Sequence, residues 1–307
     1  MPFFIPLNSL KHQVVLHLII FIWGFTAILG KLITADAFVI VWYRVLIAFV
    51  SLFIFLILLK RGIKISDIKT TFKVLGVGCL VALHWLFFYL SIKASTASLA
   101  VICLSTTTIH VAWLEPLVMK RKALKSEFIL GIVIIIGIAL ITGKVKGEGV
   151  FLGVVFGLIA ALLAALFATF NAKLIHTVSA SKITLYEMFS ATLLMTIVLF
   201  FNGDFNVKSL AVSQNDLLLL LFLGVVCTSV AFLVTVEITK FLGAFTVTLT
   251  INMEPIYTLG LAIWILQEHQ ELNFYFYLGA LIILGSVIAN AILKRRANKR
   301  LRKKLIS

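Results

Sequence analysis

The feature that most constrains this chain is a series of apolar runs about twenty residues long, separated by short polar or charged breaks. A run of that length matches an α-helix that crosses the ~30 Å hydrocarbon core of a bilayer. Hydrophobic residues fill 62% of the 307 positions and charged residues 13%, which is far from the composition of a soluble domain. The runs do not alternate apolar and polar residues, as the strands of a membrane barrel would. The sequence therefore predicts an all-α, polytopic membrane protein.

Charged clusters and turn residues divide the chain into ten predicted transmembrane helices. Clear breaks occur at Lys60-Arg61-Gly62, at Lys120-Arg121-Lys122 and at Asn202-Gly203-Asp204. We expect the spans at residues 12–30, 36–59, 72–92, 96–119, 127–143, 149–172, 182–201, 214–238, 243–266 and 273–293. The connections between them are short and leave no room for a soluble domain.

Lys and Arg residues gather in alternate connections between the predicted helices. If the N-terminus lies in the cytoplasm, the cytoplasmic connections and the C-terminal tail hold most of the 27 Lys and Arg residues. Because of the positive-inside rule, we expect a multi-pass protein of a bacterial inner membrane with both termini cytoplasmic. The net charge of +15 then reflects contact with anionic headgroups of the lipid bilayer, and not a nucleic-acid partner.

The second half of the chain repeats the first. One gap-free shift places Cys79 on Cys227, and the same shift places Gly131 and Gly137 on Gly279 and Gly285. Five helices per copy is an odd number, so the second copy enters the membrane from the opposite side. Inverted-topology repeats of this kind are typical of secondary transporters. We expect a first repeat at residues 1–146, a second at 147–294 and a basic cytoplasmic tail at 295–307.

Several short motifs resemble those of EamA-type members of the drug/metabolite transporter superfamily. They are Trp23-Gly24, Lys31 and Arg44 near the start, and Glu254-Pro255, Glu268, Gly279 and Gly285 near the end. The resemblance covers residues 12–294 and implies a ten-helix bundle that transports small metabolites, often outward. The first repeat departs from the family pattern, since Thr107 stands where many members have proline and Lys120 stands opposite Glu268.

The chain carries no motif of a hydrolytic, nucleotide-binding or redox enzyme: no Walker A, HExxH, GxSxG or dinucleotide fingerprint is present. Its three cysteines lie inside apolar runs, without the spacing of a metal site. We therefore expect no enzymatic activity, cofactor or metal. A gradient, the substrate itself or a partner must drive transport. An integral-membrane enzyme and a passive channel are the alternatives of another class.

Polar side chains inside the spans are the candidates for a site, because a polar group in hydrocarbon is costly. The candidate substrate-binding residues are Trp23, Arg44, His84, Thr107, His110, Asn252, Glu254 and Tyr257. Trp85 is one of several further aromatic residues that could enclose an apolar part of the substrate. Pro255 predicts an interrupted helix at mid-membrane, because it lacks the N–H that would bond to the carbonyl of Ile251. Packing or an internal hydrogen bond is the alternative role for these side chains. For Arg44, and for Glu187 of the second repeat, the alternative is interfacial anchoring.

The sequence thus favours a secondary transporter that works by alternating access. Export of amino acids or related polar metabolites is the first candidate function, and export of multidrug or lipid-linked substrates is the second. Glu254 and Glu187 are candidate proton carriers, because burial disfavours the charged form of a carboxyl group. Protons are therefore the candidate coupling ion. We expect Arg44 to meet an anionic substrate group in the outward half and Glu187 to act separately in the inward half. A monomer and a homodimer are both compatible with the sequence.

Overall fold

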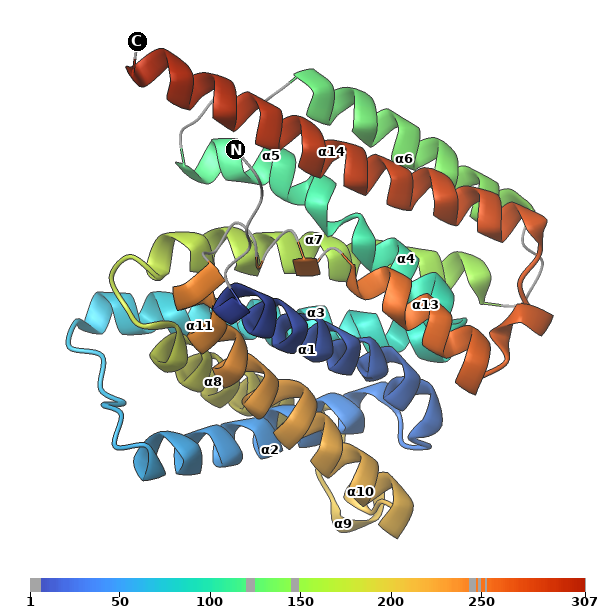
Figure 1. Ribbon diagram of the computed structural model, residues 1–307. Coiled ribbons are helices and arrows are strands. Elements are labelled where there is room, and N and C mark those ends of the chain that lie inside the picture. Colours follow the sequence, from blue (N-terminus) through green and yellow to red (C-terminus); the bar gives the residue numbers. More distant parts are fainter. Residues whose placement is uncertain are drawn as a thin grey trace.

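The computed structural model describes residues 7–119, 125–144, 149–242, 247, 250–251 and 253–306, and all regular structure within them is helical (Figure 1). The helices of the first half are α1 (Leu7–Leu32), α2 (Ala37–Leu58), α3 (Ile68–Ala94), α4 (Ala97–Ser105), α5 (Thr107–Met119) and α6 (Lys125–Lys144). Those of the second half are α7 (Val150–Leu174), α8 (Ala180–Phe201), α9 (Val207–Leu210), α10 (Gln214–Leu221), the π-helix η1 (Phe222–Val230), α11 (Ala231–Leu242), α13 (Glu254–Ile265), the 3₁₀ helix η2 (Glu268–Gln270) and α14 (Phe274–Ile306).

Seven helical segments in the described part of the chain are long and apolar enough to cross a membrane. Three shorter apolar helices, at 129–141, 254–265 and 274–289, fall where the fifth, ninth and tenth spans were predicted. The protein is thus a multi-pass, all-helical membrane protein in these residues, and the full count of ten spans stays a prediction.

Three of the predicted spans are not uninterrupted α-helices. The fourth is broken at Thr106, between α4 and α5, and the eighth passes through the π-helix η1. In the ninth, α13 begins at Glu254, and Pro255 lies in its first turn, where a missing N–H costs nothing. The interruption predicted at Pro255 is therefore a helix start. The shift that places Cys79 on Cys227 also places Thr106 on Glu254, so two of the breaks fall at equivalent positions of the two repeats.

The break at Thr106 has a local cause in its hydroxyl side chains. Ser105, Thr106 and Thr107 each donate a side-chain hydrogen bond of 2.7 Å to the carbonyl three residues earlier. Such bonds compete with the backbone ladder and bend a helix.

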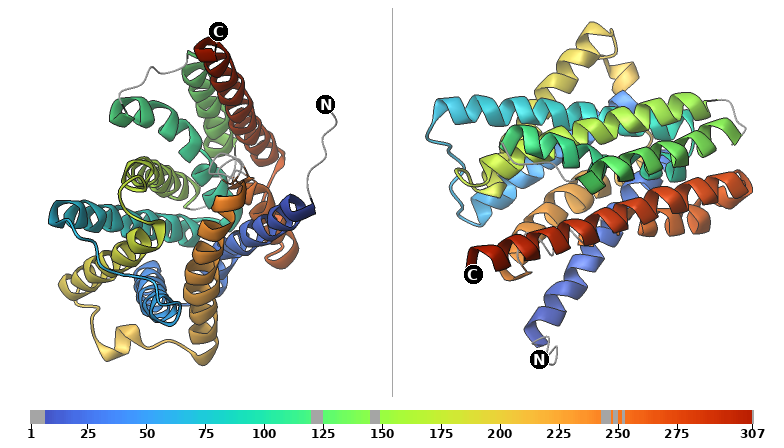
Figure 2. Two further views of the ribbon diagram at one scale, coloured as in Figure 1. Left: turned by 60° about the vertical axis from the view of Figure 1, so that its left-hand side comes forward. Right: turned by 90° about the horizontal axis from the view of Figure 1, so that it is seen from above.

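Glycines bring the two repeats into close contact. A Cβ on Gly157 of α7 would lie 2.6 Å from the Cβ of Cys103 on α4, and one on Gly153 would lie 2.4 Å from the hydroxyl of Ser95. Gly137 and Gly279 form a similar reciprocal contact between α6 and α14, which lie side by side (Figures 1 and 2). Small residues of this kind let helices approach closely within a membrane.

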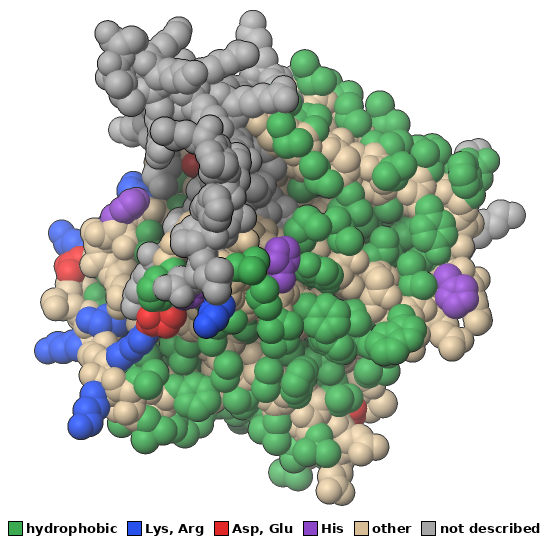
Figure 3. All heavy atoms as spheres, viewed as in Figure 1, with side chains coloured by type: hydrophobic (Ala, Val, Ile, Leu, Met, Phe, Trp, Pro, Cys, Tyr) green, Lys and Arg blue, Asp and Glu red, His purple; other side chains and the backbone are tan. Residues whose placement is uncertain are grey.

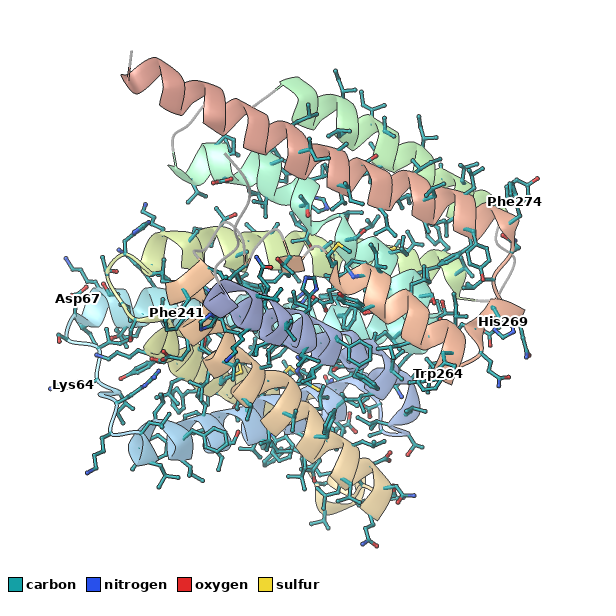
Figure 4. The ribbon with its side chains drawn as sticks, viewed as in Figure 1. Lys64, Asp67, Phe241, Trp264, His269 and Phe274 are labelled. Atoms are coloured by element: carbon teal, nitrogen blue, oxygen red, sulfur yellow. The ribbon has the colours of Figure 1, made fainter. Side chains whose placement is uncertain are left out.

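The surface is divided into a basic end and an apolar flank. Lys and Arg side chains gather at the end that carries Lys64 and Asp67, here called the basic end (Figures 3 and 4). The opposite end, here the distal end, carries Trp264, His269 and Phe274 (Figure 4). Most of the visible flank between them is hydrophobic (Figure 3). A belt of exposed apolar side chains suits contact with lipid.

Carboxylates cap helices and join the two repeats at both ends. At the basic end Asp67 caps α3, and its bonds from Thr70 lower the pKa of that carboxyl group. There, too, Arg61 forms an ion pair with Glu237 of α11. At the distal end Asp216 of α10 accepts from the backbone N and the hydroxyl of Thr34, at 2.9 and 2.5 Å. Glu268 accepts from the first two N–H groups of α4.

Candidate functional site

Arg44 is the central charged group of the candidate site. It lies in the middle of α2 and is 5% exposed. Its Nε donates to the hydroxyl of Thr228 on η1 at 3.2 Å, and its Nη1 donates to the hydroxyl of Tyr89 on α3 at 3.0 Å. The guanidinium carbon lies 3.9 Å from the ring centroid of Trp85. Side chains from two helices, α3 and η1, therefore surround the guanidinium, and we call Trp85, Tyr89 and Thr228 the Arg44 cage.

The cage holds a positive charge without a carboxylate partner. Within the described residues, the one salt bridge joins Arg61 to Glu237, and no Asp or Glu pairs with Arg44. A buried charge is costly unless it is paired. A guanidinium over an aromatic face recovers about 2 kcal/mol when it is desolvated, and neutral hydroxyl groups add less than a carboxylate would. The cage is thus suited to an anionic partner that comes from outside the chain.

Sequence reasoning found Arg44 and Trp85 but missed Tyr89 and Thr228. The spacing of Trp85 and Tyr89, four residues apart on α3, is a signal that could have paired them on one helix face. Thr228 had no comparable signal, because its hydroxyl reaches Arg44 from a helix far along the chain.

His84 lies on α3, directly before Trp85 of the Arg44 cage. Its Nδ1 lies 2.9 Å from the carbonyl oxygen of Ala160 on α7, and its ring packs near Phe88 and Phe167. The side chain is buried at 6% exposure. These contacts match the alternative role of a packed, hydrogen-bonded histidine.

Thr107 and His110 lie on α5, just beyond the break in the fourth span. Besides its bond to Leu104, the Thr107 hydroxyl contacts the carbonyl of Ala161 on α7 at 3.3 Å. The Nδ1 of His110 is buried and has no partner among the described residues. Its ring meets Trp113 edge-on. Thr107 therefore fastens the break to α7, while His110 keeps an unused polar atom.

Glu254 begins α13 at the equivalent break of the second repeat. Its side chain is partly exposed. The start of a helix carries a partial positive charge from its free N–H groups. The Glu254 carboxylate therefore lies in the positive field of this helix start. Asn252, which was expected beside it, lies outside the described residues.

Trp23 and Tyr257 belong to a different apolar cluster, between α1, α11 and α13. Both pack against buried Leu16 and Ile20, and the Tyr257 hydroxyl lies 2.8 Å from Nδ1 of His17. Trp85 and Tyr89 of the Arg44 cage are instead part of the largest cluster, which includes α2, α3 and η1. Trp23 and Tyr257 therefore lie in a different cluster from the Arg44 cage.

Glu187 forms a separate polar centre between α7 and α8. It is 4% exposed and accepts a 2.7 Å bond from Nδ2 of Asn171. The Oδ1 of Asn171 is buried without a partner among the described residues. Glu187 and Arg44 thus have different partners, and no direct pair forms between them in this structure.

Comparison with known proteins places this geometry in context. A model of the EamA-like transporter family matches residues 12–143 and 151–292. No curated protein matches the chain in sequence. Among solved structures, one titled only "Crystal structure of protein" is 13% identical, with a TM-score of 0.61. The match covers 92% of this chain and 97% of that one. At this identity the likeness concerns the fold alone.

Proposed function

The chain belongs to the EamA-like transporter family, whose members are membrane transporters of the drug/metabolite superfamily, and from that premise we propose that it is a secondary transporter of a small anionic or zwitterionic metabolite. Export of amino acids or related polar metabolites is the first candidate. The proposed setting is a bacterial inner membrane with the basic end toward the cytoplasm.

The observation that carries the proposal is the Arg44 cage. A guanidinium presents N–H donors in a planar fork that matches a carboxylate in two parallel bonds. In the cage, only two of these donors are taken by the described residues, both by neutral hydroxyl groups. Intramembrane charges mark substrate and ion pathways in transporters. An anionic substrate would supply the charge partner that the described chain does not.

The two repeats support alternating access about this region. Both contribute to the cage, since Arg44 and Tyr89 come from the first repeat and Thr228 from the second. Polar contacts also link the repeats at each end, through Asp216 and Glu268 at the distal end and through Arg61 and Glu237 at the basic end. Opening either end requires that its contacts separate, so the two sets are the proposed gates.

Proton coupling is proposed at Glu254 and Glu187. Glu254 begins α13 at the break that is equivalent to the one at Thr106 in the first repeat, and on this proposal binding of an anion in the cage changes the cost of ionising its carboxyl group. Glu187 lies apart, with one amide partner, where a proton can be gained without disturbing the cage. We propose that Glu254 senses the substrate and that Glu187 serves the basic-end half of the pathway.

Export of multidrug or lipid-linked substrates is the second candidate function. It is favoured by an aromatic group along α1 and α13 in which Phe21, 39% exposed, meets Tyr257 at 6.0 Å between ring centroids. A substrate with a large apolar part would use this group in addition to the cage.

A thermal-shift screen tests the proposed substrate class. Purified protein is heated with each of the twenty L-amino acids and, separately, with the α-amide of each. We expect one or more amino acids to raise Tm while the matching amides, which lack the carboxylate, do not. Equal shifts with acids and amides would contradict recognition of an anion. Stabilisation by apolar cations alone would favour the second candidate function.

A further inference from the structure

A π-helix of nine residues, η1 (Phe222–Val230), packs against α2 at Arg44. π-Helical turns are rare and frequently occur at functional sites. They alter the i→i−4 ladder, so they persist where other contacts compensate for the change. In η1 those contacts involve the hydroxyl groups of two adjacent residues, Thr228 and Ser229.

Thr228 has a hydroxyl group whose direction is fixed by the π-helical register. Its Oγ1 donates to the carbonyl of Leu223, five residues earlier, at 2.9 Å. The single hydroxyl proton is thereby used, and the oxygen lone pairs are left to accept. Arginine can only donate, so Nε of Arg44 finds an acceptor aimed at it, at 3.2 Å. In a regular α-helix the residue five positions earlier lies further round the helix, and this bond would not form in the same way.

Two other contacts fasten η1 to α2 independently of the guanidinium. Gly224 lets the backbones approach, since a Cβ there would lie 2.6 Å from Cγ2 of Ile47. The Ser229 hydroxyl donates to the carbonyl of Ala48 at 3.0 Å and lies 2.7 Å from the hydroxyl of Ser51. The position of Thr228 is therefore set by the packing of η1 on α2 and does not depend on its contact with Arg44.

On the α3 side, Trp85 covers one face of the guanidinium and Tyr89 takes one N–H of Nη1. Thr228 takes the N–H of Nε. Together these three contacts define the plane of the group and its rotation within that plane. No described residue accepts a hydrogen bond from Nη2.

We propose that Thr228, held by the π-helix η1, is a positioning residue that fixes the Arg44 guanidinium so that its Nη edge is presented to a planar carboxylate. This inference rests on the proposed function for the identity of the ligand. Thr228 acts through Arg44. Loss of its hydroxyl leaves the charge in place but removes the contact that sets the orientation, which weakens two-point binding of a carboxylate.

The test compares Thr228→Val, Thr228→Ser and the matched control Thr192→Val, with full-length protein in detergent. Valine keeps the volume of threonine and loses the hydroxyl, and serine restores the hydroxyl. The control makes the same substitution on α8, where the Thr192 hydroxyl donates to the carbonyl of Met188 in its own helix at 2.7 Å. The first readout is the ¹⁵N-arginine NMR signal of Nε–H, assigned to Arg44 by its loss in Arg44→Lys. The second is the affinity for sodium benzoate, with benzamide as its uncharged match.

We expect the Nε–H signal of Arg44 to be sharp and slow to exchange in the wild type, Thr228→Ser and Thr192→Val, and to exchange quickly in Thr228→Val. Benzoate affinity should fall about tenfold in Thr228→Val alone, the loss of one charge-assisted bond. Slow Nε–H exchange in a folded Thr228→Val protein would overturn the positioning role. So would unchanged benzoate affinity, or no benzoate binding by the wild type.

The test distinguishes failure of the positioning role of Thr228 from failure of the proposed function. If benzoate and the NMR signal respond as expected but no metabolite is transported, the proposed function fails and the positioning role stands. If metabolites are transported with equal affinity by Thr228→Val and the wild type, the positioning role fails and the proposed function stands.

Discussion

Removing the carboxylate of Glu268 should weaken the distal end by an amount that can be worked out from its bonds. Glu268 is 3% exposed, and its two oxygens accept from the backbone N atoms of Ala97 and Ser98, at 2.7 and 2.9 Å. The next N–H, that of Leu99, is taken by the Thr96 hydroxyl. The buried first turn of α4 therefore has no spare acceptor in these contacts for the two N–H groups that Glu268 serves.

Leaving a buried N–H unpaired costs about 1–3 kcal/mol. Glu268→Gln keeps one acceptor oxygen, so it should cost about 1–3 kcal/mol, plus about 0.3–1 kcal/mol for the lost interaction of the charge with the helix N-terminus. Glu268→Ala loses both acceptors and should cost about twice as much. At about 2–4 °C per kcal/mol for chains of 150–250 residues, glutamine should lower Tm by several degrees and alanine by more.

The assay is thermal unfolding of the purified protein in detergent. Glu271→Gln, an exposed neighbour beyond the same 3₁₀ turn, is the control and should leave Tm within about 1 °C of the wild type. The reasoning is refuted if the three variants have the same Tm, or if glutamine lowers it more than alanine.

Three further predictions concern the charged centres and the packing. Arg44→Ala should abolish counterflow of the anionic metabolite identified by the thermal-shift screen while folded protein is retained. The double swap Arg44→Glu with Glu187→Arg should not restore counterflow, since the two side chains have separate partners. Recovery of counterflow in the double mutant would show a direct pair. Glu254→Gln should transport with a flattened pH profile between pH 5 and 8, because the titrating group is gone; a profile identical to the wild type would exclude Glu254 as the coupling group. Gly157→Ala should lower the free energy of unfolding by about 1–3 kcal/mol through overpacking against α4. Its Tm should therefore be lower than that of Gly285→Ala, whose added Cβ meets nothing within 4 Å. Equal Tm values for the two variants would contradict the packing argument.

The helices were predictable because their cause is local. A run of apolar residues long enough to cross the bilayer must be helical, since every backbone N–H and C=O has to be paired within it. Charges and glycines mark where such a run stops, and the ends of α2 and α8 fall within two residues of the prediction. The start of α13 at Glu254 also follows from one residue, Pro255, which comes directly after Glu254 in the sequence.

The interruption of the eighth span by the π-helix η1 had no such signal in the sequence. The stretch from Leu217 to Val226 is a uniform run of leucine, valine, phenylalanine and glycine, which suits an α-helix equally well. Its π-helical register depends on hydroxyl contacts with α2, which arise only once the helices pack. Local sequence therefore predicts the span and not its interruption.

The candidate site divides in the same way. Arg44 stood out because a charge within an apolar run is costly and needs a reason. The partners of Arg44 could not be predicted from the sequence, since Thr228 is supplied by the other repeat through a long-range contact. Trp23 and Tyr257 were grouped with Arg44 by their aromatic character alone, and the three-dimensional packing assigns them to another cluster.

Counterflow in proteoliposomes tests the central claim most directly. Vesicles that contain the protein are loaded with an excess of an unlabelled amino acid identified by the thermal-shift screen, and uptake of the labelled form from outside is followed. The account predicts transient, saturable accumulation of label in wild-type vesicles and none with Arg44→Ala. Uptake that rises linearly with concentration, without overshoot, would contradict alternating access and indicate a channel.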